Sequence, residues 1–318
     1  MRLVCGRTLL AALVSGIMLI LAGTSFGAAR ISVMMSQRSS AHNVVFESFQ
    51  QAMDRSKATI IGTYDLEGDM ESGSGYAGEI RESGSDMVLA IGTTAALVAK
   101  EELEDIPIVF CMVLNPVSSG LIENMASPGG NVTGASLDIP LEVQYKYMKL
   151  LIPEMRTVGV IYRPEETGIL VEAAIQLARS MNISLIAKPV KTESEVHDSL
   201  DAILGMIDVL WSVADGTVFG QQSTQHILLT TLRTGMPFMG LSHSFVKAGA
   251  LFALSCDYAD IGKQAAEIAD RVLKGENPGD IAVAVPRKIS LSINLRTAKH
   301  IGLHIPENTI RSADMVIK

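Results

Sequence analysis

Short polar segments follow several apolar, strand-like runs of this chain, and their residue types suit the binding of charged groups. The run Met87–Ile91 leads into Gly92-Thr93-Thr94 at the expected start of a helix. The glycine allows close approach, and two hydroxyls with free amide groups suit a carboxylate. The run Val209–Val213 leads in the same way into Asp215-Gly216-Thr217, whose acid could receive an ammonium group. Together the two segments could hold a molecule that carries both charges.

Other polar residues stand at further strand ends. Asn115 follows one apolar run, Ser136 ends another, and Tyr162 could form an aromatic wall. Ligands of open α/β sheets lie beyond the carboxyl ends of the strands, so this repeated placement is the argument for a binding site. Two alternatives remain open, because Thr93 could simply cap its helix and Asp215 could form a local turn.

The segment Gly73-Ser74-Gly75-Tyr76-Ala77-Gly78 spells the G-x-G-x-x-G pattern of dinucleotide sites. Such a site needs its glycines directly after a strand, where amide groups can meet the pyrophosphate. Here the preceding strand ends at Tyr64, and four acidic residues in the gap would repel phosphate. We therefore expect no cofactor, and a flexible surface loop over Glu67–Gly78.

The sequence offers no recognisable metal or catalytic motif. Among the six histidines, His300 and His304 have helical spacing, but Gly302 lies between them and no third ligand is close in sequence. H-E-x-x-H, phosphate-loop and G-x-S-x-G patterns are missing from the sequence. We therefore expect no metal and no enzyme, with a two-lobed α/β enzyme kept as a remote alternative.

The apolar period alternates between strand-like and helix-like along the chain. The predicted strands are Ile31–Met35, Thr59–Tyr64, Met87–Ile91, Ile108–Val113, Val132–Ser136, Val158–Tyr162, Leu185–Val190, Val209–Val213, Pro237–Gly240, Ala250–Leu254 and Ile289–Ile293. The predicted helices include Val44–Ala52, Ala95–Leu103, Leu141–Leu151, Ile169–Met181 and Ile261–Leu273, the last with Asp257 as a possible cap. This alternation is typical of βαβ units and parallel sheets.

Eleven strands in about 290 residues exceed one comfortable sheet, so we expect an α/β protein with two doubly wound parallel-sheet lobes on a multi-strand hinge. Extended segments near residues 137–140, 254–257 and 285–287 are the candidate crossings. They divide the chain into lobe 1, residues 30–138 and 256–285, and lobe 2, residues 139–255 and 286–318.

Composition limits the class of protein. The chain has 318 residues, of which 48% are hydrophobic and 19% charged, so it can bury a large core and is not disordered. Its net charge of −8 argues against nucleic acid as a partner. Three cysteines in such a length exclude a disulfide-stapled mini-domain.

The first residues have the pattern of an export signal. Two arginines precede the uncharged run Thr8–Ala29, which ends in small residues. We expect residues 1–29 to be a signal peptide cleaved within 27–29, with an uncleaved anchor as the alternative. Thr24 stands where a lipoprotein box requires cysteine, so we expect an exported, periplasmic protein that is not a lipoprotein.

Two cysteines remain after this leader, Cys111 and Cys256, each in an apolar run. Buried free thiols are one interpretation, and an oxidising compartment also permits a disulfide. Sequence alone does not bring the two sulfur atoms together, so both interpretations stay open.

The chain also resembles a known family over about residues 30–306. The most specific segment is Ser127-Pro128-Gly129-Gly130-Asn131-Val132-Thr133-Gly134. Other matches are Ile106–Phe110, Asn115-Pro116-Val117, Gly120-Leu121, Val160–Pro164, Asp215-Gly216-Thr217, Lys247–Ala250, Asp257-Tyr258, Ile293–Ala298 and Gly302–Pro306. These segments resemble the ABC transporter substrate-binding proteins typified by the tryptophan/tyrosine-binding, TrpX-like lipoproteins.

The resemblance implies a type I periplasmic-binding-protein fold with a small molecule held between two lobes. It implies ligand contacts by Thr93 and Thr94 from the first lobe and by Asp215 and Thr217 from the second. Asn115, Ser136, Tyr162 and Asp257 also fall on matching segments and complete the candidate site. The chain departs from the family where Ser-Asp-Pro reads Leu114-Asn115-Pro116, where Arg163 replaces an asparagine, and where Asp-Asn-Thr reads Asp215-Gly216-Thr217.

These inferences predict an extracytoplasmic, monomeric solute-binding component of an ABC importer. It would hold a small amino-acid-like ligand, aromatic ones included, and hand it to a permease with its ATPase. The alternative is a ligand sensor that feeds a membrane histidine kinase or a chemoreceptor.

Overall fold

The computed structural model describes residues 28–53 and 58–318, so residues 1–27 of the predicted signal peptide lie outside the described part. The strands are β1 (Arg30–Met35), β2 (Thr59–Asp65), β3 (Met87–Ile91), β4 (Ile108–Val113), β5 (Val132–Ser136), β6 (Thr157–Tyr162), β7 (Ser184–Pro189), β8 (Val209–Trp211), β9 (Phe238–Gly240), β10 (Phe252–Cys256), β11 (Ile289–Asn294) and β12 (Met315–Ile317). The helices are α1 (Ser40–Met53), α2 (Ser72–Ser83), α3 (Thr93–Glu102), α4 (Leu141–Leu151), α5 (Pro164–Ser180), α6 (Val196–Leu204), α7 (Gln221–Thr234), α8 (His243–Ala248), α9 (Tyr258–Leu273), α10 (Leu295–His300) and α11 (Glu307–Ser312). No helix in this described part is both long and apolar enough to cross a bilayer.

Lobe 1 contains a five-stranded parallel sheet with the order β2-β1-β3-β4-β5. Every residue of β3 is buried, which is why this strand reads in sequence as a continuous apolar run. Successive residues of β1 pack into the cores on opposite faces of the sheet. Val33 packs with α1 and α9, and Met34 packs with α2 and α3. Helices therefore cover both faces, as the sequence predicted.

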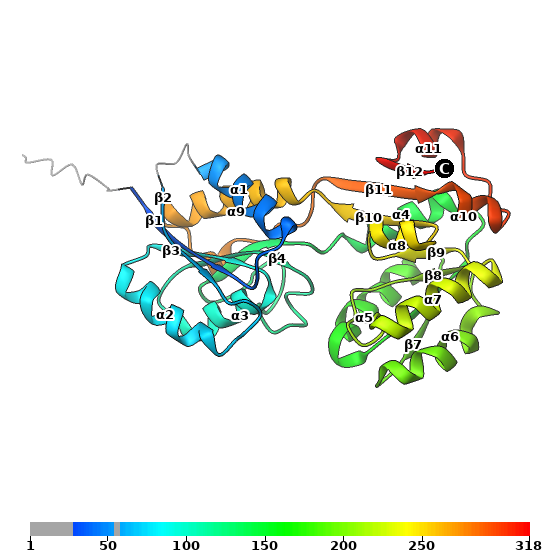
Figure 1. Ribbon diagram of the computed structural model, residues 1–318, viewed down its shortest axis with the longest axis horizontal. Coiled ribbons are helices and arrows are strands. Elements are labelled where there is room, and N and C mark those ends of the chain that lie inside the picture. The colour runs from blue at the N-terminus through cyan, green and yellow to red at the C-terminus, as the bar shows by residue number, and fades with distance from the viewer. Residues whose placement is uncertain (1–27, 54–57) are drawn as a thin grey trace, which may run out of the picture.

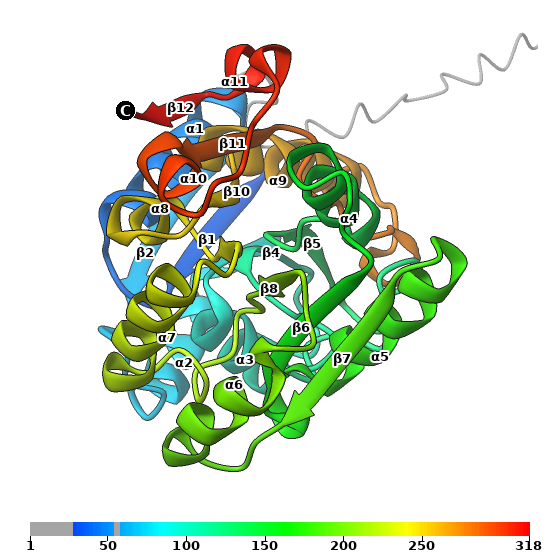
Figure 2. The same ribbon diagram turned by 90° about the vertical axis from the view of Figure 1, so that its right-hand side faces the viewer.

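Lobe 2 contains a seven-stranded sheet with the order β12-β11-β10-β9-β8-β6-β7. Its pairings are parallel except for β10 with β11, which run antiparallel because β11 enters the sheet directly from lobe 1. One face packs on α4 and α5 around Trp211 and Tyr145, and the other packs on α6 and α7. Figure 2 views this sheet from the end of the molecule.

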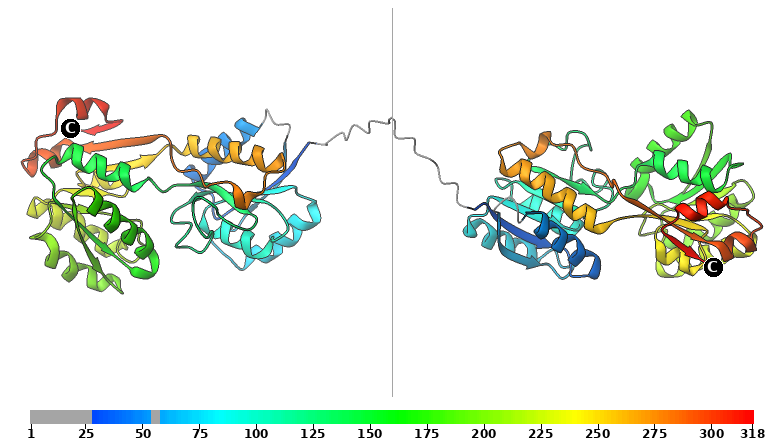
Figure 3. Two further views of the ribbon diagram at one scale, coloured as in Figure 1. Left: turned by 180° about the vertical axis from the view of Figure 1, so that it is seen from behind. Right: turned by 90° about the horizontal axis from the view of Figure 1, so that it is seen from above.

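The two sheets lie side by side along the long axis and are joined by extended segments (Figures 1 and 3). The chain crosses after β5, after β10 and before β11. Backbone hydrogen bonds tie these crossings together, from Ser136 N to Ala284 O at 2.8 Å and from Asp257 N to Lys288 O at 3.2 Å. The prediction of two α/β lobes is confirmed, and we propose the lobe boundaries at 138/139, 255/256 and 285/286.

An ion-pair cluster fixes the third crossing to lobe 1. Arg287 Nε lies 2.8 Å from Asp260 Oδ2 on α9, and the side chain of Asp260 is only 4% exposed. Glu267 and Lys288 complete the cluster. Burial by itself would raise the pKa of Asp260, but hydrogen bonds and charges from Arg287 and Lys288 outweigh it and hold that pKa below its usual value.

The flexible loop predicted over Glu67–Gly78 is wrong for most of its length, because α2 begins at Ser72. Gly73 is buried against α3, where a Cβ would lie 2.4 Å from Val98 Cγ1. The first glycine of the G-x-G-x-x-G pattern thus allows two helices to pack closely. The terminal strand β12 was not predicted either, since three half-buried residues carry too little periodic signal.

The contact between α1 and α9 generates a prediction about Gly262. A methyl group there would lie 2.3 Å from the carbonyl oxygen of Val45, so Gly262→Ala forces the helices apart. We expect a loss of about 1–3 kcal/mol in the free energy of unfolding. The control Gly78→Ala on α2 meets nothing within 4 Å, and its better helix propensity should add up to ~1 kcal/mol. Denaturant unfolding of both variants decides this, and equal stabilities would contradict the packing.

Candidate ligand-binding site

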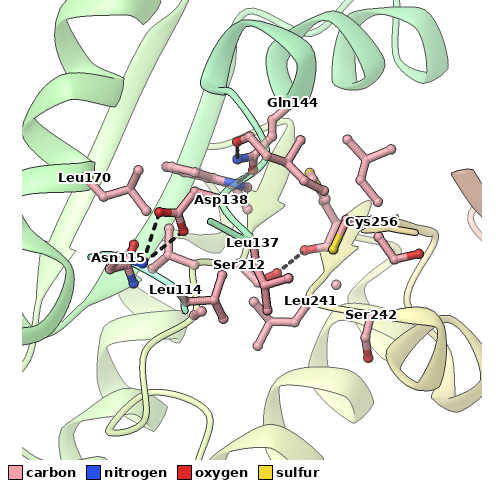
Figure 4. A pocket seen from close by; sticks show the side chains of 18 of the residues that line it. Leu114, Asn115, Leu137, Asp138, Gln144, Leu170, Ser212, Leu241, Ser242 and Cys256 are labelled. Atoms are coloured by element: carbon pink, nitrogen blue, oxygen red, sulfur yellow. Dashed lines mark hydrogen bonds between the residues drawn. The ribbon is translucent and has the colours of Figure 1, made fainter. Parts of the chain in front are cut away.

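A cavity of about 250 Å³ lies between the two lobes, at the carboxyl ends of strands from both sheets. Lobe 1 contributes residues that follow β4 and β5, and lobe 2 contributes residues that follow β8 and β9 (Figure 4). Parallel α/β sheets bind ligands at this edge. The residues that line it include Leu114, Asn115, Leu137, Asp138, Gln144, Leu170, Trp211, Ser212, Leu241, Ser242, Leu254, Cys256 and Tyr258.

The cavity walls are mainly apolar. Leucine side chains come from both lobes and from separate elements, with Leu114 and Leu137 on one side and Leu170, Leu241 and Leu254 on the other. Leu114 is 41% exposed, so part of this apolar surface is uncovered in the present arrangement. Such walls suit a ligand with a hydrophobic body.

The backbone around Asn115 is shaped toward the cavity. The pairing of β4 with β5 shifts register between Cys111 and Val113, and Met112 has a φ of +59°. Asn115 has a φ of +49°, a left-handed conformation that asparagine tolerates well. Bulges and left-handed residues occur often beside functional sites because they redirect the chain. Here they direct the backbone N–H of Asn115 toward Asp138, in the crossing segment that follows β5.

The side chain of Asp138 accepts a hydrogen bond from the backbone amide of Asn115. The N–H of Asn115 donates to both carboxylate oxygens of Asp138 at 3.0 Å, and the Ser136 hydroxyl donates to Oδ2 at 2.9 Å. Burial raises the pKa of Asp138, and these two donors offset only part of that shift. A carboxylate thus lies in the wall of the cavity, beside apolar side chains.

Two further polar arrangements border the cavity. The indole N–H of Trp211 donates to Gln144 Oε1 at 2.8 Å, which satisfies the polar edge of a ring only 2% exposed. Trp211 belongs to the lobe 2 core, as the sequence predicted, and one side of it still reaches the cavity. Burial raises the pKa of the Cys256 thiol to about 11, so the thiol is uncharged near pH 7. Cys111 and Cys256 are both free.

Of the predicted site residues, Asn115 lines the cavity and Ser136 supports it from behind. Thr93 and Thr94 lie at the start of α3, beyond the cavity lining but on the same edge of the lobe 1 sheet. Their hydroxyls make no hydrogen bond to any described residue. Gly92 has a φ of +96° and leaves no room for a Cβ beside Ser36 Oγ.

Asp215 has a structural role that the sequence did not reveal. Its side chain is 2% exposed, and Oδ2 accepts from Arg163 N at 2.7 Å and from Thr167 Oγ1 at 2.8 Å. Oδ1 accepts from Val218 N at 3.0 Å. All these donors belong to lobe 2, and Asp215 does not line the cavity, so its contacts in the described structure are those of an internal turn.

The other predicted residues also have local roles. The Thr217 hydroxyl donates to Glu166 Oε1 at 2.5 Å, and Tyr162 packs on the lobe 2 core. Asp257 caps α9 by accepting from Asp260 N, as expected of a helix cap. None of Thr217, Tyr162 and Asp257 lines the cavity in the described structure.

Sequence reasoning missed Asp138, Gln144 and Ser212 as cavity residues. Asp138 lies in the segment that was interpreted as a linker, and Gln144 lies on a helix behind it. One signal was available in the sequence, because Asp138 is a single acidic residue between apolar neighbours in a segment that joins the two lobes. Linker segments at a hinge also pass close to both lobes by necessity.

The chain is similar to a known protein family and to a curated protein. A family model described as ABC transporter substrate binding protein matches residues 53–317. A curated protein named tyrosine-binding protein, from Clostridioides difficile (strain R20291), is 30% identical over 237 residues. That alignment covers 74% of this chain and 68% of the relative.

Solved structures show the same fold. A substrate binding protein with adhesive properties from Clostridium difficile, in its ligand-free, open form, has a TM-score of 0.76 at 24% identity, covering 92% of this chain and 100% of that one. An ABC domain in complex with L-Trp from Streptococcus pneumonia has a TM-score of 0.68 at 23% identity, covering 91% and 100%. A periplasmic binding ribose operon repressor protein from Lactobacillus acidophilus has a TM-score of 0.53 at 10% identity, covering 82% and 95%. The predicted type I periplasmic-binding-protein fold is confirmed.

The internal contacts of Asp215 lead to a stability prediction. Asp215→Ala would leave buried donors on Arg163, Thr167 and Val218 without an acceptor, so we expect the free energy of unfolding to fall by at least ~2 kcal/mol. Glu172→Ala removes the same charge from the exposed face of α5 and should change it by less than ~0.5 kcal/mol. Thermal unfolding of the ligand-free variants compares the two. An unchanged melting temperature for Asp215→Ala would contradict this role.

Proposed function

This chain belongs to the ABC transporter substrate binding protein family, and from that premise we propose that it is the extracytoplasmic solute-binding component of an ABC importer. It would hold a small amino-acid-like ligand between its lobes and deliver it to a membrane permease driven by an ATPase. The observation that carries this proposal is the cavity at the facing edges of the two sheets, lined from both lobes.

The cavity suits one amino acid. At about 250 Å³ it is just below the usual size range of small-molecule pockets, which favours a single small ligand over a peptide. Its leucine walls fit a hydrophobic side chain, and the related proteins named for tyrosine or solved with L-Trp support an aromatic amino acid. Thr93 and Thr94, with free hydroxyls at a helix N-terminus, remain the proposed contacts for the ligand carboxylate.

The proposed cycle is equilibrium binding without chemistry. A ligand favours the closed arrangement only through contacts that the open arrangement lacks. Leu114 and Tyr258 are 41% and 39% exposed beside the cavity, so closure has apolar surface left to cover. That surface would become exposed to water again when the permease opens the lobes and releases the ligand unchanged.

Export fits the same proposal. The predicted signal peptide would carry the chain across the membrane, and the missing acceptor cysteine at Thr24 makes a periplasmic protein without a lipid anchor the expected product. The chain would then meet its permease as a diffusing monomer.

A ligand panel tests the proposed function. We expect L-tryptophan, L-tyrosine, L-phenylalanine or L-leucine to raise the melting temperature and to bind with a Kd in the micromolar range or below, by calorimetry. Native mass spectrometry of freshly purified protein should detect a co-purified molecule of that class. A panel of all standard amino acids without any binding, together with an empty native spectrum, would remove the amino-acid proposal. Stimulation of the cognate ATPase by the liganded protein separates importer from sensor.

Leu114 provides a second test, because it is 41% exposed in the described structure and lies in the cavity wall. Leu114→Ala removes apolar contact that forms on ligand binding, and we expect affinity to fall about fivefold to thirtyfold, or ~1–2 kcal/mol. The control Leu229→Ala truncates a 59% exposed leucine on α7, outside the cavity lining. Calorimetry should separate the two variants while both unfold like the wild type. Equal affinities would place the ligand elsewhere.

A further inference from the structure

The cavity wall contains an acid whose charge no described side chain balances. Asp138 is the single Asp, Glu, Lys, Arg or His among the described residues that line the cavity. None of the ion pairs between described residues includes it. A partly buried carboxylate without a cation is costly to keep in a folded protein.

The hydrogen bonds of Asp138 do not use its full capacity. An ionised carboxylate has about four acceptor positions. Among the described residues, only the backbone N–H of Asn115 and the hydroxyl of Ser136 donate hydrogen bonds to Asp138. The Asn115 amide is shared between the two oxygens, so Oδ1 receives no donor of its own. Asp215, at the corresponding edge of lobe 2, receives three separate donors instead.

The titratable groups around Asp138 supply no positive charge. From β10 and α9 these are Cys256, Asp257 and Tyr258. Burial raises the pKa of both Cys256 and Tyr258, so each stays neutral near pH 7, and Asp257 is a further acid that caps α9. The helices α4 and α5 present Gln144 and Leu170 to the cavity, and neither side chain is charged.

We propose that Asp138 receives the ammonium group of the ligand, so that this position selects small molecules that carry an ammonium group and a hydrophobic body. The inference rests on the proposed function and assigns within that site the contact that decides its charge specificity. The ligand places its ammonium beside Asp138 Oδ1 and its apolar part among Leu114, Leu137 and Leu170. Figure 4 shows the Asp138 carboxylate hydrogen-bonded to Asn115, with Leu114, Leu137 and Leu170 around it.

The pH dependence follows from the ionised form of Asp138. Since burial raises its pKa in the free protein, protonation begins at a higher pH than for an exposed aspartate near 3.9. Affinity for an ammonium ligand is therefore full above that raised pKa and is lost as the pH falls through it. Removing the carboxylate charge removes this dependence.

The first experiment compares Asp138→Asn with wild type, using L-tryptophan and L-leucine as probes in calorimetry from pH 4.5 to 8. The variant keeps an oxygen for the Asn115 amide, so we expect it to fold with an unchanged or higher melting temperature without ligand. Its affinity should fall about 10- to 100-fold at neutral pH and become nearly independent of pH. The control Asp198→Asn, on the exposed side of α6, should bind as the wild type does.

The second experiment uses the wild-type protein, so it does not depend on a variant that folds. Tryptamine and L-tryptophan amide keep the ammonium and should retain measurable binding, whereas N-acetyl-L-tryptophan loses it and should not bind. If Asp138→Asn binds amino acids as the wild type does at every pH, or N-acetyl-L-tryptophan binds normally, the role of Asp138 is wrong while the proposed function stands. If only amines without a carboxylate bind, and Asp138→Asn abolishes that binding, the role of Asp138 stands and the amino-acid function is wrong.

Discussion

The antiparallel pairing of β10 with β11 is the interaction on which the rest of the structure depends. It holds two of the three crossings side by side, with Cys256 opposite Ile289, and the pair continues into the hydrogen bond from Asp257 to Lys288. Arg287 then anchors this pair to Asp260 on α9, where little water reaches the carboxylate. These contacts tie the crossing segments to each other and to lobe 1 beside the cavity. The candidate cavity lies beside these crossings, where residues of both lobes come together.

At this hinge, groups that favour ligand binding lower the stability of the free protein. The free protein keeps an unbalanced carboxylate at Asp138 and exposed apolar side chains at Leu114 and Tyr258. Each feature is unfavourable without ligand, and each becomes favourable when a cation with a hydrophobic body fills the cavity. Asp260 shows the opposite solution, because Arg287 and Lys288 neutralise it within the chain. The partly buried Asp138 and the buried Asp260 thus differ in whether a ligand or the protein itself provides the cation.

Sequence patterns predicted the sheets and their edges more fully than the site. Continuous apolar runs such as Met87–Ile91 identify buried parallel strands, and the polar residues after them mark the correct edge of each sheet. The pattern does not tell which of these polar groups are used by nearby backbone. Asp215 and Asn115 both follow strands, yet the first is enclosed by donors of its own lobe while the second lines the cavity. Gly73 shows the same limit, because its packing against Val98 depends on two helices that meet only in the folded chain.

The charge at Asp138 cannot provide the affinity alone. A micromolar Kd corresponds to about −8 kcal/mol, and a charge-assisted hydrogen bond contributes roughly 1.5–3 kcal/mol of that. Covering ~200 Å² of apolar surface at ~25 cal/mol per Å² would add about 5 kcal/mol, before the losses from ordering the ligand and closing the lobes. The remainder has to come from the other end of the ligand, where Thr93 and Thr94 offer free hydroxyls on lobe 1. A ligand with only one polar end would therefore satisfy Asp138 and still bind weakly, so tight binding requires both charges of an amino acid.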